Sequence, residues 1–218
     1  SLSLDPVRDF APMSLATYVP YMLVCHPSMP FKNFQEFVKY GTENKGRLSY
    51  CSAGTGNSTH LSMELLKILT KVDVTHVPYK GTGQALTDLL GNHVQLIWGT
   101  IPPSFPHVRS GRLRGLAVGG AKRSKAVPEF PTVVELGYPG YEAASWFGLL
   151  APVGTPKNVI TILNREAVKA LNAPELNDRL SAEGAEPVGN TPEEFALFIK
   201  EEVAKWGRVA KAAGIARQ

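Results

Sequence analysis

Short apolar runs alternate with helical segments of roughly ten residues over the first half of this 218-residue chain. The runs that we interpret as strands are 18–25, 48–52, 74–79, 94–98 and 113–118. Turns rich in Gly, Pro, Asn or Ser bound them, and helical segments separate them. Apolar strands joined by single helices are typical of βαβ units. The pattern therefore predicts an α/β fold with a parallel sheet.

Polar residues mark where several helices begin. Asn33 and Glu36 have the spacing of a capping box, and so have Thr191 and Glu194 near the C-terminus. Ser58 precedes an apolar stripe with helical spacing and is expected to cap that helix. These signals predict helix starts near residues 34, 58 and 191.

The overall composition excludes several classes of protein. Apolar residues make up 44% of the chain and charged residues 19%, which excludes a disordered chain. No uninterrupted apolar stretch approaches the ~18–20 residues that a membrane span needs. The 23 Lys and Arg exceed the 19 Asp and Glu by only four, and the densest basic cluster is Lys122, Arg123 and Lys125. A cluster this short does not indicate a nucleic-acid surface, so no nucleic-acid partner is expected.

The last third of the chain is unbalanced. It contains three amphipathic helices, predicted at 156–171, 174–182 and 191–213, but one clear strand at 144–152. One strand is too little to cover three apolar helix faces. Part of this sheet is therefore missing from the chain, or another subunit supplies it.

The segment between the strand 48–52 and the next helix is the strongest candidate binding site. It consists of Ser52, Ala53, Gly54, Thr55, Gly56, Asn57 and Ser58. Glycines allow a close approach of the backbone to a ligand, and a helix N-terminus offers unpaired N–H groups. The segment is neither a Walker loop nor a dinucleotide fingerprint. It predicts a carboxylate or phosphate site, with an ordinary strand–helix turn as the alternative.

Two further turns follow strands of the same predicted sheet. They contribute Thr82, and Gly99 with Thr100, as candidate ligand-binding residues. In an open α/β sheet, ligands bind at the carboxyl ends of the strands. Trp98, at one strand end, is expected either to wall a pocket or to lie in the core.

Residues that could carry catalysis or hold a metal form no recognisable arrangement. The five histidines show no metal-ligand spacing, no G-x-S-x-G elbow is present, and no nucleophile has a base placed beside it. We therefore expect no catalytic residue, no metal and no cofactor, which favours a binding protein over an enzyme. Cys25 and Cys51 lie in apolar runs and are interpreted as buried core residues, with a disulfide left open.

Long strings of this sequence resemble the Bug family, the solute-binding proteins of tripartite tricarboxylate transporters. The strings include DPVRDFAPMSLA, LSYCSAGTGNSTHLSMELL, VTHVPYKGTGQALTDLLGNHVQLIW and AKRSKAVPEFPTVVELGYPGYEAASWFGLLAPVGTP. They extend over essentially the whole chain. The resemblance implies a two-lobed, type II periplasmic binding protein that closes like a Venus flytrap around a small carboxylate and delivers it to a membrane permease.

The resemblance also assigns parts of the chain to lobes. Residues 25–142 correspond to the second lobe, and 1–24 with 143–218 to the remainder of the first lobe. The family's N-terminal strands are missing, so one lobe is incomplete, and we expect a homodimer through it. No signal peptide is visible from Ser1 onward, either because none existed or because it was removed, and a periplasmic location follows from the resemblance alone.

The resemblance bears on the ligand as well. It implies that the loop 52–58 holds a ligand carboxylate. The family often has Asp where this chain has Gly99, and that Asp meets the amino group of amino-acid ligands, so plain tricarboxylates or dicarboxylates are favoured here. Of Trp146 and Phe147, one is expected to line the cleft and the other to lie in the core, because strand neighbours point to opposite faces. A ligand-sensing domain for a regulatory partner, and an enzyme with an anion site, remain as alternatives.

Overall fold

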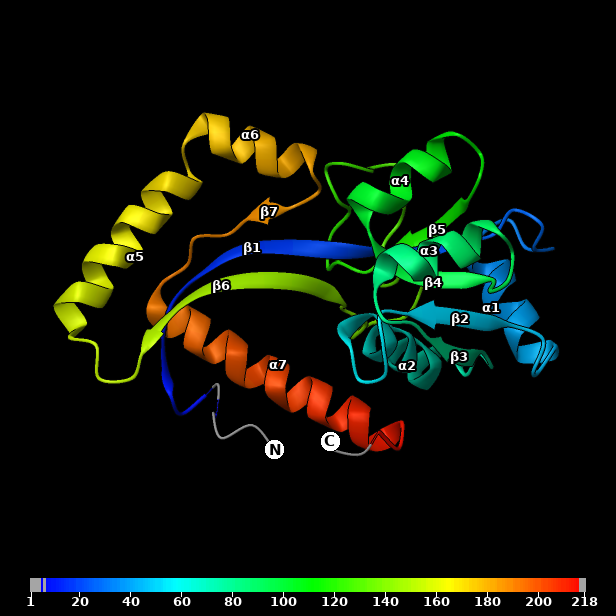
Figure 1. Ribbon diagram of the computed structural model, residues 1–218, viewed down its shortest axis with the longest axis horizontal. Helices are drawn as coiled ribbons and strands as arrows, with labels where there is room; N and C mark the ends of the chain where they lie inside the picture. The colour runs from blue at the N-terminus through cyan, green and yellow to red at the C-terminus, as the bar shows by residue number, and fades with distance from the viewer. Residues whose placement is uncertain (1–4, 6, 216–218) are drawn as a thin grey trace. The chain divides into compact units, whose positions relative to one another are not determined.

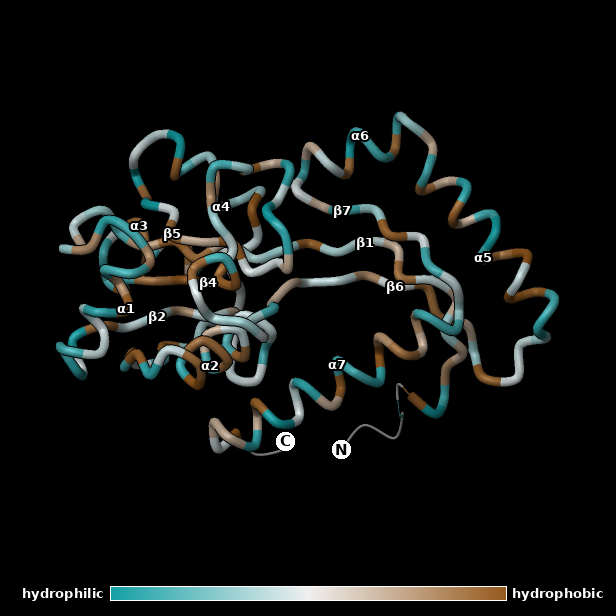
Figure 2. The backbone as a smooth tube through the Cα atoms, turned by 180° about the vertical axis from the view of Figure 1, so that it is seen from behind, coloured by the Kyte–Doolittle hydropathy of each residue, from teal (hydrophilic) through white to brown (hydrophobic). Residues whose placement is uncertain are grey.

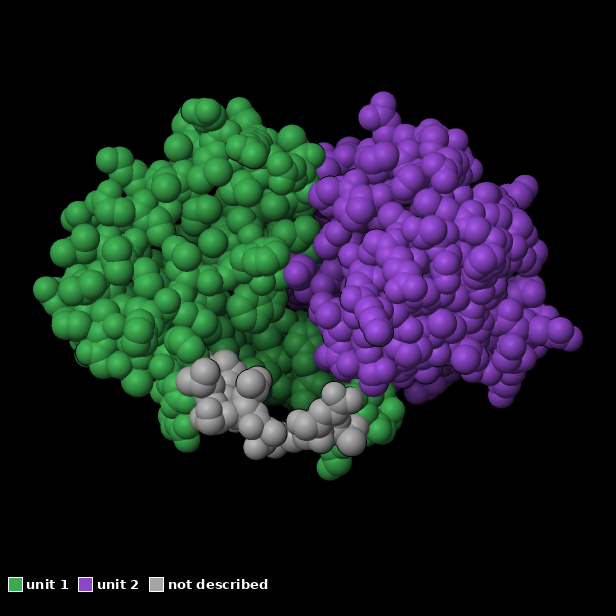
Figure 3. Space-filling model, in the orientation of Figure 1, with its two compact units in different colours: residues 1–19, 146–218 green, residues 20–145 purple. Residues whose placement is uncertain are grey.

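The structure is a computed structural model that describes residue 5 and residues 7–215. The start at Ser1, on which the expectation about a signal peptide depends, lies outside the described residues. The chain divides into two compact units, which Figure 3 colours separately. Unit 1 combines residues 1–19 with 146–218, and unit 2 is the continuous segment 20–145.

Unit 2 is built on a mixed five-stranded sheet (Figure 1). Its strands are β1 (Phe10–Cys25), β2 (Ser49–Ser52), β3 (Thr75–Pro78), β4 (Leu96–Thr100) and β5 (Arg114–Val118), in the order β3-β2-β4-β1-β5. The expected parallel direction is right for β2 with both β3 and β4. It is wrong for β1, which pairs antiparallel with β4 and β5. Hydrophobic periodicity indicates that a strand exists but not in which direction it runs, so the sequence pattern did not reveal these antiparallel pairs.

Four helices connect the strands of unit 2. They are α1 (Phe34–Glu43), α2 (Ser58–Thr70), α3 (Thr82–Leu90) and α4 (Ile101–Arg109). The Asn33 side chain accepts the N–H of Glu36, as predicted. The cap of α2 is Asn57 rather than the expected Ser58, because the Asn57 side chain accepts the N–H of Thr59. An Asn cap places the helix start within the glycine-containing loop itself.

The core of unit 2 contains the two cysteines. Cys25 and Cys51 are completely buried and both are free thiols, which confirms their interpretation as core residues. Burial raises the pKa of each thiol to about 12, so neither is a reactive thiolate at neutral pH. Trp98 is also fully buried and stacks on Tyr141 with ring centroids 5.4 Å apart. Of the two expectations for Trp98, the core position is therefore the right one.

Unit 1 contains the three predicted helices, α5 (Lys157–Leu171), α6 (Pro174–Ala182) and α7 (Pro192–Ala212). The capping box between Thr191 and Glu194 is present at α7. The expectation of a single strand here is wrong. The first part of β1 pairs with β6 (Ala144–Pro152) and with the two-residue strand β7 (Glu186–Pro187).

Many large apolar side chains of unit 1 are exposed. Figure 2 shows hydrophobic positions along α5 and α7. On the helices and on β6, the exposed side chains are Phe147, Leu149 and Leu150 on β6, Val159, Ile162 and Leu163 on α5, and Leu197 and Val203 on α7. Only part of these helix faces is covered, by clusters around Met13 and Leu15 of β1. Within the described residues, no helix combines the length and apolar character that a membrane crossing needs.

Candidate functional site

The site lies at the carboxyl ends of three parallel strands of unit 2. Ser52 of β2 pairs with Pro78 of β3, and Cys51 with Ile97 of β4, so all three strands end at one edge. The helices α2, α3 and α4 begin directly after these ends. Three helix N-termini, each with the positive end of a helix dipole, therefore gather at this edge of the sheet.

The glycines of the loop 52–58 adopt conformations that other residues rarely take. Gly54 has φ 136° and Gly56 has φ 77°. A Cβ on Gly54 would also touch the carbonyl oxygen of Tyr79 at 3.4 Å. These two positions allow the backbone to reverse direction between β2 and α2.

Most backbone N–H groups of this loop are already used inside the protein. The Ala53 N–H donates to Thr59 Oγ1 at 3.0 Å, and the Gly54 N–H to Ser52 Oγ at 3.1 Å. The Gly56 N–H donates to His60 Nδ1 at 2.9 Å, and the Asn57 N–H to the Gly54 carbonyl at 3.2 Å.

Two loop N–H groups remain for a ligand. Among the described residues, the N–H groups of Thr55 and Ser58 have no acceptor. Both residues are exposed. The Ser58 hydroxyl lies 2.7 Å from Tyr21 Oη, which places a buried β1 tyrosine beside the loop. The loop can thus offer two N–H donors with hydroxyl groups beside them, the pattern that suits one carboxylate.

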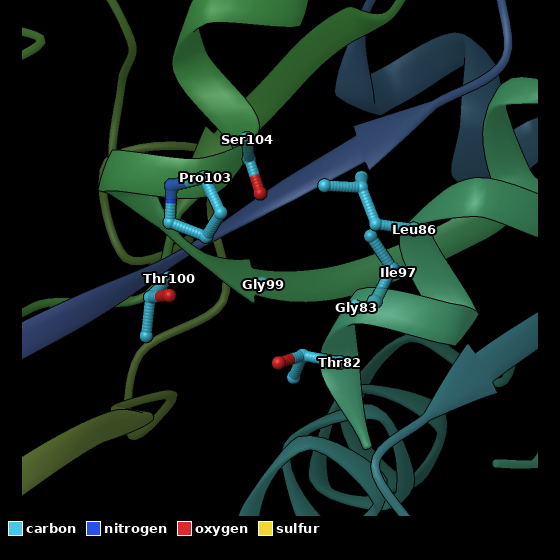
Figure 4. A pocket seen from close by; sticks show the side chains of 8 residues that line it. All are labelled: Thr82, Gly83, Leu86, Ile97, Gly99, Thr100, Pro103 and Ser104. Carbon is cyan, nitrogen blue, oxygen red and sulfur yellow. The ribbon is translucent and has the colours of Figure 1, made fainter. Parts of the chain in front are cut away.

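A second part of the edge is a small cavity of about 70 Å³ (Figure 4). It brings together three predicted residues, Thr82, Gly99 and Thr100, with Ser104 of α4. Leu86, Ile97, Gly83 and Pro103 complete its lining. Figure 4 shows the hydroxyl groups of Thr82, Thr100 and Ser104 around Gly99. Within the part of the chain that the structure describes, no side chain caps the N-terminus of α3 or of α4.

Trp146 and Phe147, the other two predicted ligand-binding residues, belong to unit 1. The Trp146 indole N–H donates to Glu202 Oε2 at 3.2 Å, and its ring packs edge-on against Phe195 and Phe198. Phe147 is 62% exposed. The two neighbours thus differ in burial, as strand alternation predicts, while a ligand contact for either one stays a prediction.

Sequence reasoning missed three residues of this edge: Tyr21, His76 and Ser104. For His60, in the first turn of the helix after the loop, the sequence allows contact with an anion but favours a packed or surface histidine. His76 Nε2 lies 2.6 Å from Ser52 Oγ, so a base does lie beside this buried hydroxyl, contrary to the expectation from the sequence. His60 Nδ1 accepts the Gly56 N–H. Tyr21, His76 and Ser104 carry no local signal, because they reach the site from β1, β3 and α4. Among residues 5 and 7–215, no group of three His, Cys, Asp or Glu side chains is placed to hold a metal ion.

The chain is similar to a known protein family over nearly its whole length. The sequence profile described as "Tripartite tricarboxylate transporter family receptor" matches residues 1–215. The protein BugT of Bordetella pertussis is 34% identical over 214 residues, which are 98% of this chain and 66% of BugT. The chain spans 60 to 66% of the length of several curated relatives.

Solved structures show the same fold. "R. palustris Rpa4515 with adipate" is 38% identical, with a TM-score of 0.86 over 99% of this chain and 72% of that one. "MatC (Rpa3494) from Rhodopseudomonas palustris with bound malate" is 33% identical, with a TM-score of 0.79 over 96% of this chain and 72% of that one. The predicted α/β periplasmic-binding-protein fold is thereby confirmed.

Proposed function

Because the chain belongs to the tripartite tricarboxylate transporter receptor family, we propose that it is a non-enzymatic solute-binding protein that captures a small carboxylate. The observation that carries the proposal is the pair of unpaired N–H groups, on Thr55 and Ser58, at the N-terminus of α2. Paired N–H donors at a helix start match the two oxygens of a carboxylate.

The ligand class proposed is a dicarboxylate or a related organic acid without an amino group. Two similar structures contain adipate and malate, which are both dicarboxylates. Among the described residues, the lining of the cavity at this edge of the sheet has hydroxyl groups and Gly99 but no carboxylate side chain. Such a lining offers an ammonium group no opposite charge, which supports plain acids over amino acids.

Isothermal titration with adipate and malate tests this function. Both acids are expected to bind, whereas 1,6-hexanediol, which has the chain of adipate without its charges, is not. Gly56→Val should weaken binding, because a β-branched residue is strained at φ 77° and crowds the approach to Thr55 and Ser58. Gly46→Val is the matched control, since Gly46 has φ 72° and lies in an open turn after α1. Equal affinity of the two variants would contradict the assignment of the loop.

The proposed partner is the membrane permease of a tripartite tricarboxylate transporter, and the proposed location is the periplasm. The family name and the related "periplasmic binding protein BugD" support both. In this scheme unit 2 corresponds to the second lobe, predicted at 25–142, and unit 1 to the remainder of the first lobe.

We also propose that the chain forms a homodimer through unit 1. The exposed apolar residues on β6, α5 and α7 support this, because monomers rarely expose apolar patches beyond a few hundred Å². A second copy offers the same face, and two identical faces close most simply as a two-fold dimer.

A further inference from the structure

Two stacked histidines lie beneath the candidate loop, and the proposed function makes no use of them. The rings of His60, on α2, and His76, on β3, have centroids 3.8 Å apart and planes 8° apart. The Tyr50 ring of β2 lies 4.9 Å from His76 on the same stack. His60 is 5% exposed. A stack this close is a fixed part of the packing rather than a pair of mobile surface rings.

Each ring contacts a different part of the loop. His76 Nε2 lies 2.6 Å from Ser52 Oγ, and this hydroxyl also accepts the Gly54 N–H. His60 Nδ1 accepts the Gly56 N–H at 2.9 Å. The two glycines with positive φ are thus held, directly or through Ser52, by the two imidazoles. The unpaired N–H of Thr55 lies between them in the sequence.

The contact with Gly56 fixes the protonation state of His60. A ring nitrogen that accepts an N–H carries no proton, so the neutral ring is protonated at Nε2. Nε2 lies 3.7 Å from Glu64 Oε1. If Nδ1 were protonated as well, its N–H would point at the Gly56 N–H. Two donors would then face each other, and the Gly56 N–H would have no acceptor.

We propose that His60 and His76 are positioning residues of the carboxylate site: as neutral rings they hold the loop 52–58 in its anion-binding shape, and protonation of His60 releases Gly56 and weakens binding. The effect on ligand binding rests on the proposed function. The effect on the shape of the loop rests only on the hydrogen bonds.

Burial and the Lys67 ammonium favour neutral rings at pH 7, against the Glu64 carboxylate, which favours charged ones. Three titratable groups of the described residues face the stack. They are Tyr50 of β2 and Glu64 and Lys67 of α2. Glu64 Oε1 accepts both the Tyr50 hydroxyl and the Lys67 ammonium at 2.8 Å, so its charge is already shared. Burial lowers the pKa of His60, and burial together with His60 lowers the pKa of His76 to about 4. Two charged rings at this separation would also repel each other.

A purely electrostatic role for His60 predicts the opposite behaviour. A charged imidazole close to the loop would attract an anion, so affinity would rise as the pH falls. The positioning role predicts that affinity falls. The sign of the pH dependence therefore separates the two.

The structural part is tested by NMR on the ligand-free protein. Spectra of the ring nitrogens at pH 7.5 should show His60 Nδ1 without a proton. Between pH 7.5 and 5, the Gly56 amide should shift together with the His60 ring and lose protection from hydrogen exchange. In His60→Asn, whose Oδ1 can replace Nδ1 as acceptor, this pH dependence should disappear. A Gly56 amide that ignores pH while His60 titrates would overturn the proposal.

The binding part is tested by titration with adipate at pH 7.5 and 5.5. Protonation of the ligand is common to all variants. The measured quantity is therefore the affinity at pH 7.5 divided by the affinity at pH 5.5, compared between wild type and His60→Asn. The wild-type ratio should exceed that of His60→Asn, but by less than about tenfold, because the lowered pKa of His60 leaves part of the rings neutral at pH 5.5. His93→Asn, at a histidine side chain that is 73% exposed, should behave as wild type.

The outcomes of the two arms are distinct. A smaller ratio in wild type than in His60→Asn would overturn the positioning role in favour of the electrostatic one. Should His60→Asn fail to fold, the Gly56 amide of the wild-type protein still decides the proposal, since it must lose protection as His60 becomes protonated. If adipate does not bind at any pH, the proposed ligand is wrong, and the Gly56 amide still decides the role of His60.

Discussion

A side chain on Gly99 would collide with Ser104. A Cβ at position 99 would lie 2.7 Å from the Ser104 hydroxyl oxygen and 4.0 Å from the Ser104 Cβ. The collision is thus with the hydroxyl alone. It explains locally why this strand end carries glycine, and it makes the pair testable.

Gly99→Asp is expected to destabilise the protein by about 1–3 kcal/mol, the usual cost of overpacking at a buried position. Adding Ser104→Ala should recover part of this loss, because it removes the colliding oxygen. Urea unfolding of the two single variants and the double variant measures the coupling. Gly83→Asp is the control, since it lines the same cavity with no atom within 4 Å of its Cβ position. Additive effects at 99 and 104 would argue against the collision.

Glu202 joins three side chains of unit 1. Its Oε2 accepts the indole N–H of Trp146 at 3.2 Å and that of Trp206 at 2.8 Å, and Lys205 forms an ion pair with Oε1. Glu202→Ala should cost about 2 kcal/mol, because two N–H donors lose a charged acceptor. Urea unfolding and tryptophan fluorescence both report the change.

Glu201→Ala provides the comparison for this experiment. Glu201 is the neighbour of Glu202 on α7 and is exposed. Glu201→Ala changes the net charge and the helix propensity by the same amount as Glu202→Ala. It should leave the free energy of unfolding within about 0.5 kcal/mol of the wild-type value. Equal losses in both variants would show that the indole contacts contribute nothing.

Tyr79 should make stability depend on pH in alkaline solution. Its hydroxyl donates to Asp88 Oδ2 at 2.7 Å, and this bond to a carboxylate, with some burial, raises the pKa of Tyr79 to about 12. The folded protein therefore holds this proton more tightly than the unfolded chain. The contribution is fully present below about pH 10 and is lost as pH rises toward 12.

The measurement is the difference in unfolding free energy between wild type and Tyr79→Phe. This difference should shrink between pH 10 and 12, while other titrating groups affect both proteins alike. A constant difference over that range would show that the bond to Asp88 does not shift the titration.

The proposed homodimer is tested by light scattering at micromolar concentration. The expected mass is twice the 23.6 kDa of the chain. Ile162→Glu combined with Leu163→Glu should yield a monomer, because both side chains are more than 40% exposed on α5 and charges there oppose apolar contact. Val134→Glu, at an exposed apolar residue of unit 2, should leave the dimer intact. A compact wild-type monomer would refute the proposal.

Local chemistry explains which parts of the fold the sequence could predict. Helix starts at Asn33 and Thr191 follow from side-chain caps a few residues long, so the sequence contains the whole signal. The first part of β1 gives no such signal, because Pro12 interrupts it and its partners β6 and β7 come more than a hundred residues later. Strand direction likewise depends on partners distant in sequence.

The candidate site shows the same division. Glycines in a strand–helix loop pointed to residues 52–58, because positive φ is a local demand. Which N–H groups of the loop stay unpaired could not be predicted. The side chains of Thr59 and His60 accept two of them, and they do so only once α2 has formed. The contribution of His76 comes from a separate strand altogether.

Unit 1 is made of two segments that are far apart in the sequence, and this has a consequence for synthesis on the ribosome. Unit 2 is one continuous stretch and can fold as soon as residue 145 has emerged, whereas Thr17 must wait for its partner Pro187. Until β6 and then β7 have emerged, the first part of β1, with the core residues Met13 and Leu15, is a nascent apolar strand without these two partners. Such segments attract chaperones and promote misassembly. The early half of β1 is therefore where a slowed or stalled translation would first yield aggregates.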